Sequence, residues 1–272
     1  MNIKKIIEII KKEFEFEDFN WLPNFIREAI TRLIVVLHKM LKTDEIIASL
    51  ILKAKNNSSF SQIVDLGSGA GGAMPQVMKL MNDKGQDVKM LLTDLHPNKK
   101  AISHIEKLGI DNLSYHVDSV NALHFESMPT GLKTMVNSFH HMSPEIAQKI
   151  LKSAESNKEP FLIYEIAENK VPTIIWWLLL PLSLVILIIM SLFMTPFVKP
   201  LTFKQIVFTF LIPIIPIIYA WDGQASSQRM YTFDDLKTLI GELDTPYYKW
   251  EMAQAKNDKG KNVGYYVLGL PK

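Results

Sequence analysis

Between residues 171 and 221 the chain carries only two charged side chains, Lys199 and Lys204, and this narrows the folds open to it. We call this stretch the hydrophobic insert. The rest of the chain has the mixed charge of a soluble domain. Because the 30 basic and 28 acidic residues nearly cancel, we expect no nucleic-acid partner, since counterion release requires a cationic surface.

The sequence gives no sign of a disulfide or of a metal site. The chain has no cysteine, so we predict no disulfide framework, no thiolate metal site and no cysteine nucleophile. The histidines at positions 96, 104, 116 and 124 lack the spacing of metal ligands, and we predict no metal site.

The chain before residue 58 is predicted to be helical. In residues 3–14, Ile and Phe side chains recur at helical spacing, with lysines on the opposite side. Such a basic amphipathic helix either lies on an anionic membrane surface or packs on the domain, and the sequence leaves both open. Two further helices are expected at residues 24–42 and 43–54.

Strand and helix patterns alternate from residue 61 onward, which indicates a parallel, doubly wound sheet. After the insert, Thr232 and Asp235 have the spacing of a capping box, which predicts a helix ending near residue 243. A short polar turn joins the last two strands, so they should form an antiparallel hairpin. The expected strands are residues 61–66, 88–93, 113–117, 134–139, 161–166, 247–255 and 263–268.

A glycine-rich loop, residues 67–72, follows the first expected strand and precedes a helix. Glycines at this place let the backbone turn sharply and approach a ligand at the carboxyl edge of the sheet. Gly67, Gly69 and Gly72 also match the dinucleotide fingerprint GxGxxG, a match that is weak on its own.

Three acids stand at or near the ends of successive strands. Asp65 precedes the glycine loop, Asp94 follows the second strand and Asp118 follows the third. A carboxylate at Asp94 can accept hydrogen bonds from both hydroxyls of a ribose, and one at Asp118 from an adenine amine. Each acid alone is more simply a helix cap or a turn residue. Together, beside a glycine loop, they indicate a nucleoside-binding site.

These residues resemble the class I S-adenosylmethionine-dependent methyltransferases over residues 61–165 and 222–271. The resemblance rests on the motif Asp65-x-Gly67-x-Gly69-x-Gly71, on Asp94, on Asp118-Ser119 and on the C-terminal hairpin. It implies a seven-stranded sheet, S-adenosylmethionine as methyl donor and direct transfer of the methyl group to an acceptor. The cofactor-binding residues that it implies are Asp65, Gly67, Ser68, Gly69, Gly71, Asp94, Leu95, Asp118, Ser119 and Asn137.

An NAD(P)-dependent oxidoreductase is an alternative. It explains the glycines and Asp94, but not Asp65, because dehydrogenase fingerprints are usually apolar there. It also leaves the helical N-terminus and the terminal hairpin unexplained.

A narrower resemblance, to a group of bacterial membrane-associated methyltransferases of unassigned substrate, rests on residues outside the glycine loop. We expect four of them, Trp21, Arg27, Arg229 and Tyr231, to bind substrate, and an arginine beside a tyrosine suits an anionic head group. The residues that carry this resemblance are Trp21-x-Pro23, Arg27, Phe139-His140-His141, the hydrophobic insert, Trp221-Asp222-Gly223 and Arg229-x-Tyr231.

Two histidines and one acid are candidate catalytic residues. His140 and His141 follow the fourth expected strand, and a histidine there could deprotonate an acceptor at neutral pH. In the other interpretation one of them caps the helix at Ser143 and the other faces solvent. Glu165 ends the fifth strand, where it either faces the cleft or binds a neighbouring backbone amide.

Residues 171–198 carry no charge and exceed the roughly 20 residues that a transmembrane helix needs. The sheet begins before the insert and ends after it, so an odd number of crossings is excluded. Either a two-span hairpin or a shallow hairpin in one leaflet remains, and six prolines favour the shallow, bent form. The lysines at the bend favour the cytoplasmic side. A buried helical lid or a dimer interface is the alternative without a membrane.

The sequence therefore predicts an α/β, Rossmann-like, doubly wound seven-stranded sheet. We expect an N-terminal helical cap at residues 1–57, a methyltransferase domain at residues 58–170 and 222–272, and a membrane hairpin at residues 171–221. The expected activity is transfer of a methyl group from S-adenosylmethionine to a lipophilic or membrane-associated acceptor at the cytoplasmic face of the membrane. A non-catalytic, nucleotide-binding membrane scaffold is the alternative from another class.

Overall fold

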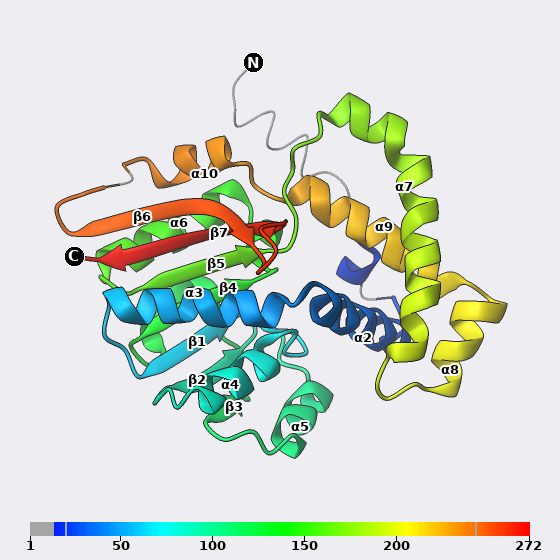
Figure 1. Cartoon of the computed structure of the whole chain (residues 1–272), viewed down its shortest axis with the longest axis horizontal. Helices are drawn as coiled ribbons and strands as arrows, with labels where there is room; N and C mark the ends of the chain where they lie inside the picture. The colour runs from blue at the N-terminus through cyan, green and yellow to red at the C-terminus, as the bar shows by residue number, and fades with distance from the viewer. Residues whose placement is uncertain (1–13, 20, 243) are drawn as a thin grey trace. The chain divides into compact units, whose positions relative to one another are not determined.

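The computed structural model describes residues 14–19, 21–242 and 244–272, and Figure 1 shows its path. The amphipathic helix expected at residues 3–14 lies outside these residues except for Phe14. The chain divides into two compact units. We call Leu41–Glu168 with Tyr231–Lys272 the sheet unit, and Met1–Met40 with Asn169–Met230 the hairpin unit.

The sheet unit is built on seven strands in the order β3-β2-β1-β4-β5-β7-β6. The first five strands are parallel, and β7 runs antiparallel to β5. Strands β6 and β7 pair antiparallel, as the short turn between them predicted. The strands are β1 (Gln62–Leu66), β2 (Lys89–Thr93), β3 (Leu113–Tyr115), β4 (Leu132–Val136), β5 (Phe161–Glu165), β6 (Tyr248–Lys256) and β7 (Asn262–Pro271).

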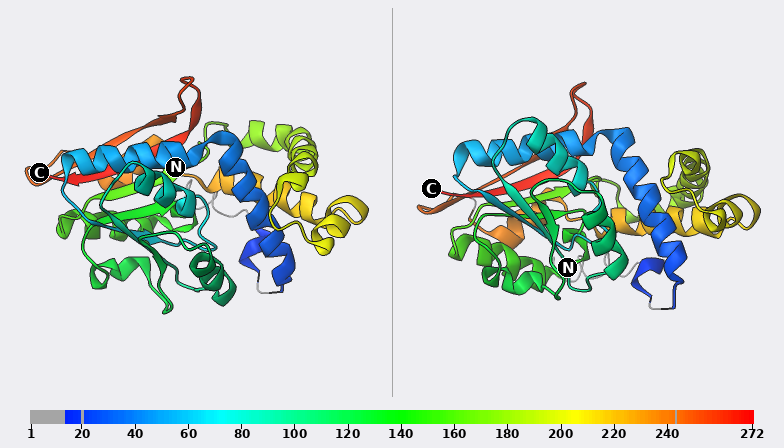
Figure 2. Two further views of the ribbon diagram at one scale, coloured as in Figure 1. Left: turned by 60° about the horizontal axis from the view of Figure 1, so that its bottom comes forward. Right: turned by 90° about the horizontal axis from the view of Figure 1, so that it is seen from below.

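Helices cover both faces of this sheet (Figure 2). On one face α3, α4 and α5 share a buried core with Leu162 and Tyr164 of β5. The alternate residues of β5, Phe161 and Ile163, point to the opposite face, because side chains alternate along a strand. There η2, α6 and α10 lie. These helices are α3 (Thr43–Asn57), α4 (Met74–Asp83), α5 (Lys99–Lys107), η2 (Ala122–Ser127), α6 (Pro144–Ser156) and α10 (Phe233–Ile240).

Helices α6 and α10 begin directly after residues whose side chains cap their N-termini. Ser143 accepts a hydrogen bond from the backbone of Ile146 at 3.4 Å, directly before α6. Thr232 and Asp235 form the predicted capping box of α10, in which each side chain accepts from the other's backbone N–H. Helix α10 ends at Ile240, a little earlier than expected.

The fourth strand begins and ends earlier than the expected range of residues 134–139. The cause is Lys133, which a sequence pattern places at a boundary but which the structure buries completely inside β4. Its ammonium group lies 2.8 Å from the carboxylate of Glu159, so the buried charge is paired. At the other end Asn137 has φ 51°, which takes the chain out of the strand.

The hairpin unit contains a second core. Residues of α2 (Asn24–Leu41), such as Ile30 and Leu33, pack there with Met194, Val198 and Ile215. Helices α7 and α9 lie side by side, and Trp176 donates to Gln224 between them at 3.1 Å. The remaining elements of the unit are η1 (Phe16–Asp18), α7 (Thr173–Met194), η4 (Thr195–Phe197), α8 (Phe203–Ile206), η5 (Val207–Leu211) and α9 (Ile214–Arg229).

This division of the chain differs from the three segments expected from the sequence. The expected cap at residues 1–57 is split, because α3 packs on the sheet core whereas α2 packs on the insert. Helix α9 also continues beyond the expected end of the insert to Arg229. An amphipathic pattern predicts that a helix has a buried face, but not which neighbour covers it.

Among the described residues, one helix, Thr173–Phe197, is long and apolar enough to cross a membrane. A second apolar segment, Phe203–Leu211 with Ile214–Arg229, is bent by 79° at its break. Only 22% of the apolar window of the first helix is buried, which is unlike the core helix of a soluble domain.

Gly264 in β7 should be indispensable for the pairing of β7 with β5. It has φ +112°, and an added Cβ would collide with the carbonyl oxygen of Glu165 and lie 2.9 Å from the Cα of Ile166. We expect Gly264→Ala to lower the free energy of unfolding by roughly 2–4 kcal/mol, measured by chemical denaturation of the full chain in mild detergent.

Gly260→Ala is the matched control. Gly260 also has positive φ, at +73°, but nothing lies within 4 Å of an added Cβ. This variant should lose only about 1–2 kcal/mol, the cost of the left-handed backbone alone. Equal losses in the two variants would contradict the role assigned to the close approach at Glu165.

Candidate functional site

The glycine loop follows β1 at the carboxyl edge of the sheet. Gly67, Gly69, Gly71 and Gly72 all have positive φ, between 49° and 97°, which side chains other than glycine rarely adopt. A Cβ at Gly67 would lie 3.2 Å from that of Ser138, whereas one at Gly69 would meet nothing within 4 Å. The loop is therefore packed on its inner side and open at Gly69.

Neighbouring strands hold this loop in place. The hydroxyl of Tyr115, which ends β3, donates to the carbonyl of Gly69 at 2.7 Å. The backbone N–H of Ser68 donates to the carbonyl of Thr93, at the end of β2, at 2.9 Å. The loop is thus positioned by hydrogen bonds with the ends of two other strands as well as by its own turn.

Asp65 is a buried carboxyl beneath the loop. It is 2% exposed, and its oxygens accept hydrogen bonds from the hydroxyls of Ser68 and Thr134, each at 2.6 Å. Burial raises the pKa of the Asp65 carboxyl to about 7, although the two hydroxyls oppose this shift by stabilising the carboxylate. Asp65 therefore changes its charge near neutral pH.

Asp94 follows β2 and is half-buried beside the loop. One carboxylate oxygen accepts from the backbone N–H of Gly69 at 2.8 Å, and the other from that of His96 at 2.8 Å. Each oxygen keeps a further lone pair for a ligand hydroxyl. The acid that the sequence assigns to a ribose is thus fixed against the glycine loop.

Three other predicted cofactor residues lie on the neighbouring loops. The hydroxyl of Ser119 donates to the carbonyl of Leu95 at 2.6 Å, which links the segments that follow β2 and β3. The side chain of Asp118 is 84% exposed. It lies beyond the end of β3, because this strand stops at Tyr115 and not at residue 117.

His140 and Glu165 form a buried pair. Nδ1 of His140 lies 2.8 Å from Oε2 of Glu165, and the backbone N–H of His140 donates to Oε1 of the same carboxylate at 3.1 Å. Glu165 ends β5, and His140 stands in η3 (Phe139–His141), just after β4. The carboxylate thus fixes the imidazole by two contacts, one of which is the backbone-amide bond that one interpretation of Glu165 predicted.

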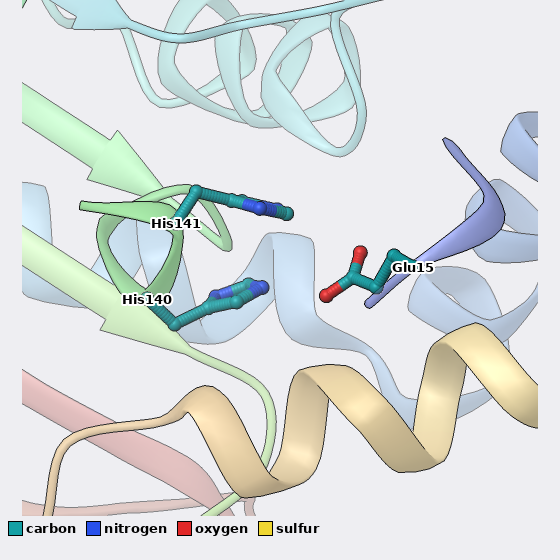
Figure 3. A group of neighbouring side chains, drawn as sticks. All are labelled: Glu15, His140 and His141. Atoms are coloured by element: carbon teal, nitrogen blue, oxygen red, sulfur yellow. The ribbon is translucent and has the colours of Figure 1, made fainter. Parts of the chain in front are cut away.

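His141 lies next to this pair and is exposed. The two imidazole rings lie next to each other (Figure 3), with their centroids 4.2 Å apart and their planes tilted by 35°. Ser143 supplies the cap of α6, a role that the sequence also left open to a histidine. The side-chain oxygen of Asn137 accepts from the backbone of Ile166 at 2.8 Å, which joins the ends of β4 and β5.

Three of the four predicted substrate-binding residues belong to the hairpin unit, where they contact the segment around η1. Arg229 lies 3.1 Å from Glu15 and 2.7 Å from Asp18, so it forms two ion pairs. Arg27 donates to the backbone carbonyls of Glu17 and Phe19.

Besides these two arginines, the predicted substrate-binding residues are the aromatic Trp21 and Tyr231. The ring of Trp21 stacks on Phe19 at 5.8 Å and is 65% exposed. Tyr231 belongs to the sheet unit and is buried there. Its hydroxyl donates to the carbonyl of Met142 at 2.7 Å. These two aromatic residues lie in different units and are not brought together within either one.

The sequence did not indicate four residues that shape the site: Thr93, Tyr115, Thr134 and Ser138. Thr93 donates its hydroxyl to the carbonyl of Asp65 at 2.8 Å, and Ser138 donates to that of Leu66 at 3.2 Å. A hydroxyl residue at or just beyond the carboxyl end of a strand that neighbours β1 is the signal that could have found Thr93 and Ser138, whereas Thr134 lies inside β4 and Tyr115 ends β3, which does not neighbour β1.

The pKa of Asp65 predicts how stability depends on pH. Because the folded protein retains a proton to about pH 7 that the unfolded chain loses near pH 4, stability falls as pH rises between these values. We expect the free energy of unfolding of the full chain, measured by chemical denaturation in mild detergent, to fall by on the order of 3 kcal/mol at most between about pH 5 and pH 7. Asp65→Asn should flatten this dependence. The exposed Asp87→Asn serves as control, and an unchanged slope in Asp65→Asn would contradict the assignment.

Comparison with protein-family models finds no match, and no curated protein matches the sequence. Several solved structures have a similar fold. A SAM-dependent methyltransferase from Aquifex aeolicus is 13% identical, with a TM-score of 0.43 over 82% of this chain and 88% of its own. LaPhzM is 14% identical, with a TM-score of 0.46 over 85% of this chain and 55% of its own. The mitomycin 7-O-methyltransferase MmcR is 12% identical, with a TM-score of 0.46 over 85% and 54%. This chain spans about half the length of LaPhzM and MmcR, and similarity at this level assigns no reaction to it.

Proposed function

We propose that this chain is an S-adenosylmethionine-dependent methyltransferase that acts on a lipophilic or membrane-associated acceptor at the cytoplasmic face of a membrane. The observation that carries this proposal is the hydrogen bond from the backbone of Gly69 to Asp94, which joins an open glycine loop to an acid at the carboxyl edge of the sheet. Ligands of open α/β sheets bind at this edge.

The residues at the edge fit the parts of S-adenosylmethionine. Asp94 would accept from the ribose hydroxyls, while Leu95 and Ser119 would line the adenine. Gly69, where an added Cβ would meet nothing within 4 Å, leaves room for the ligand at the loop. Asp65 beneath the loop supplies negative charge near a cationic amine. When bound, S-adenosylmethionine supplies an electrophilic methyl group on a sulfonium.

The histidine–glutamate pair supplies a proton acceptor. An ionised Glu165 selects the tautomer of His140 in which Nδ1 carries the proton, and this leaves the lone pair on Nε2. Nε2 then takes the proton of an acceptor hydroxyl, and Glu165 stabilises the resulting imidazolium, as the acid does in other histidine-based sites. His140 is the catalytic residue of this proposal and Glu165 is its positioning residue.

The surface of the hairpin unit supports the choice of a lipophilic acceptor. Leu178 and Phe203 are 79% and 80% exposed. No residue from 171 to 198, which includes all of α7, carries a charge. An apolar surface of this kind marks an interaction site with a partner or a membrane.

Asp94→Ala should weaken the binding of S-adenosylhomocysteine at least about tenfold, because the hydrogen bonds that the ribose hydroxyls donate to a charged carboxylate are lost. Isothermal calorimetry on the full chain in mild detergent measures this. Asp87→Ala is the matched control, since Asp87 is an exposed acid just before the amino end of β2 and should leave the affinity unchanged. Absence of binding by the unaltered protein, or binding of NAD instead, would overturn the proposal.

His140→Ala should lower methyl transfer about 10²–10⁴-fold while leaving the affinity for S-adenosylhomocysteine unchanged. The readout is transfer of a radiolabelled methyl group from S-adenosylmethionine into a total lipid extract. Glu165→Gln should also slow transfer and shift its pH profile, because a neutral amide stabilises the imidazolium less.

His124→Ala is the control, because His124 has a 71% exposed side chain. Cofactor binding with no transfer by the unaltered protein would favour the non-catalytic scaffold over the enzyme. Full activity in His140→Ala would remove His140 from the mechanism while leaving the cofactor assignment intact.

A further inference from the structure

We propose that the hairpin unit docks on one leaflet of a phospholipid bilayer, with the exposed sides of α7, α8 and α9 in the acyl chains and with neither limb crossing the membrane. This inference deepens the proposed function and rests on it for the membrane-associated acceptor. The occupant of the apolar surface is the lipid itself, and four features of the unit support this choice.

Within the insert, several polar side chains are buried while many large apolar ones are exposed. Ser191, Thr195, Gln205 and Thr209 are fully buried, although polar side chains normally face water. Ser191 and Thr195 donate their hydroxyls to backbone carbonyls of α7 at 2.7 and 2.8 Å. Large apolar side chains are exposed on the surface instead. Ile174, Leu178, Phe193, Phe197, Phe203 and Leu211 are each between 70% and 85% exposed.

The charges of this surface complement an anionic lipid head group. Residues 171–221 contain no acid, and their only charges are the exposed Lys199, between α7 and α8, and the exposed Lys204, in α8. Lysines at such a place extend their ammonium groups toward the head groups while their methylene chains remain among apolar neighbours. A protein partner would instead be expected to meet a polar rim around an apolar centre.

Helix α2 argues against two full spans. It packs on the bend of the hairpin, where Arg32 Nε donates to the side chain of Gln205 at 3.0 Å, and Gln205 donates to the carbonyl of Ala29 at 3.4 Å. Arg32 also lies 3.9 Å from Glu28. If the bend crossed the bilayer, α2 would be drawn into the hydrocarbon with these charges, which is unfavourable.

The break between η5 and α9 also fits a shallow position. The two helices are bent by 79°, Leu211 is 75% exposed, and Pro213 has no N–H to donate. Irregular backbone that faces lipid does not occur deep in the hydrocarbon, because its polar groups have no partner there. A leaflet surface tolerates it, since head groups and water remain within reach.

The chain has no cysteine, so single cysteines can report its topology. Lys199→Cys at the bend, Glu28→Cys on α2 and the exposed Lys84→Cys in the sheet unit would be added from outside to preformed vesicles of phosphatidylcholine and phosphatidylglycerol. We expect a membrane-impermeant maleimide outside the vesicles to label all three equally. Labelling of Lys199→Cys only by reagent trapped inside would overturn the docked arrangement in favour of two spans.

A second pair of variants tests whether the occupant is lipid. An environment-sensitive fluorophore on Leu178→Cys should brighten on vesicles and be quenched by lipids with nitroxides on their acyl chains, whereas one on Leu108→Cys in the sheet unit should not. A Leu178 probe that no lipid quenches would overturn the inference, because the surface then does not lie among the acyl chains.

Acidic residues introduced into the exposed apolar surface test membrane binding independently. The double variant Leu178→Asp with Leu182→Asp should lower the fraction bound to vesicles by about tenfold or more in flotation, with unchanged binding of S-adenosylhomocysteine. Retained flotation would overturn the inference. Failure of the unaltered protein to bind S-adenosylhomocysteine, together with the expected labelling, would instead overturn the proposed function alone.

Discussion

The antiparallel pairing of β5 with β7 is the contact on which both the site and the hydrophobic insert depend. It runs from Phe161 beside Gly269 to Glu165 beside Tyr265. The insert lies between these two strands in the sequence, so the chain has to leave the sheet at Glu165 and return to pair with the same strand. A membrane anchor at the end of a chain has no such restriction. The same pairing fixes Glu165, because Gly264 packs directly against its carbonyl.

A balance between desolvation and hydrogen bonding sets the charge of Asp65. Burial opposes the carboxylate, while the hydroxyls of Ser68 and Thr134 stabilise it, and the pKa settles at about 7. A group balanced in this way responds to a nearby ligand charge, since a cation favours the carboxylate. The position that the sequence singled out as an acid before the glycine loop is thus one where ligand charge and protonation are linked.

Local rules explain what the sequence predicted well. The sheet, the glycine loop, the cap at Ser143 and the capping box at Thr232 follow from patterns within a few residues, and the structure confirms each. Contacts between distant residues were not predictable. Lys133 is buried in β4 only because Glu159 pairs with it, and α2 joins the insert because of residues far along the chain. The pair of His140 with Glu165 joins two strand ends that the sequence could name only one at a time.

The chemistry of the His140–Glu165 pair narrows the acceptor that the proposed reaction would use. A histidine base has a pKa near 6.5, and a phenol has one near 10, so proton transfer between them is only moderately uphill. An aliphatic alcohol is a far weaker acid, and its proton would move to an imidazole with much greater difficulty. A carboxylate that stabilises the imidazolium reduces the gap but does not remove it. Among lipophilic acceptors, the pair therefore favours one with a phenol-like hydroxyl over a simple fatty alcohol.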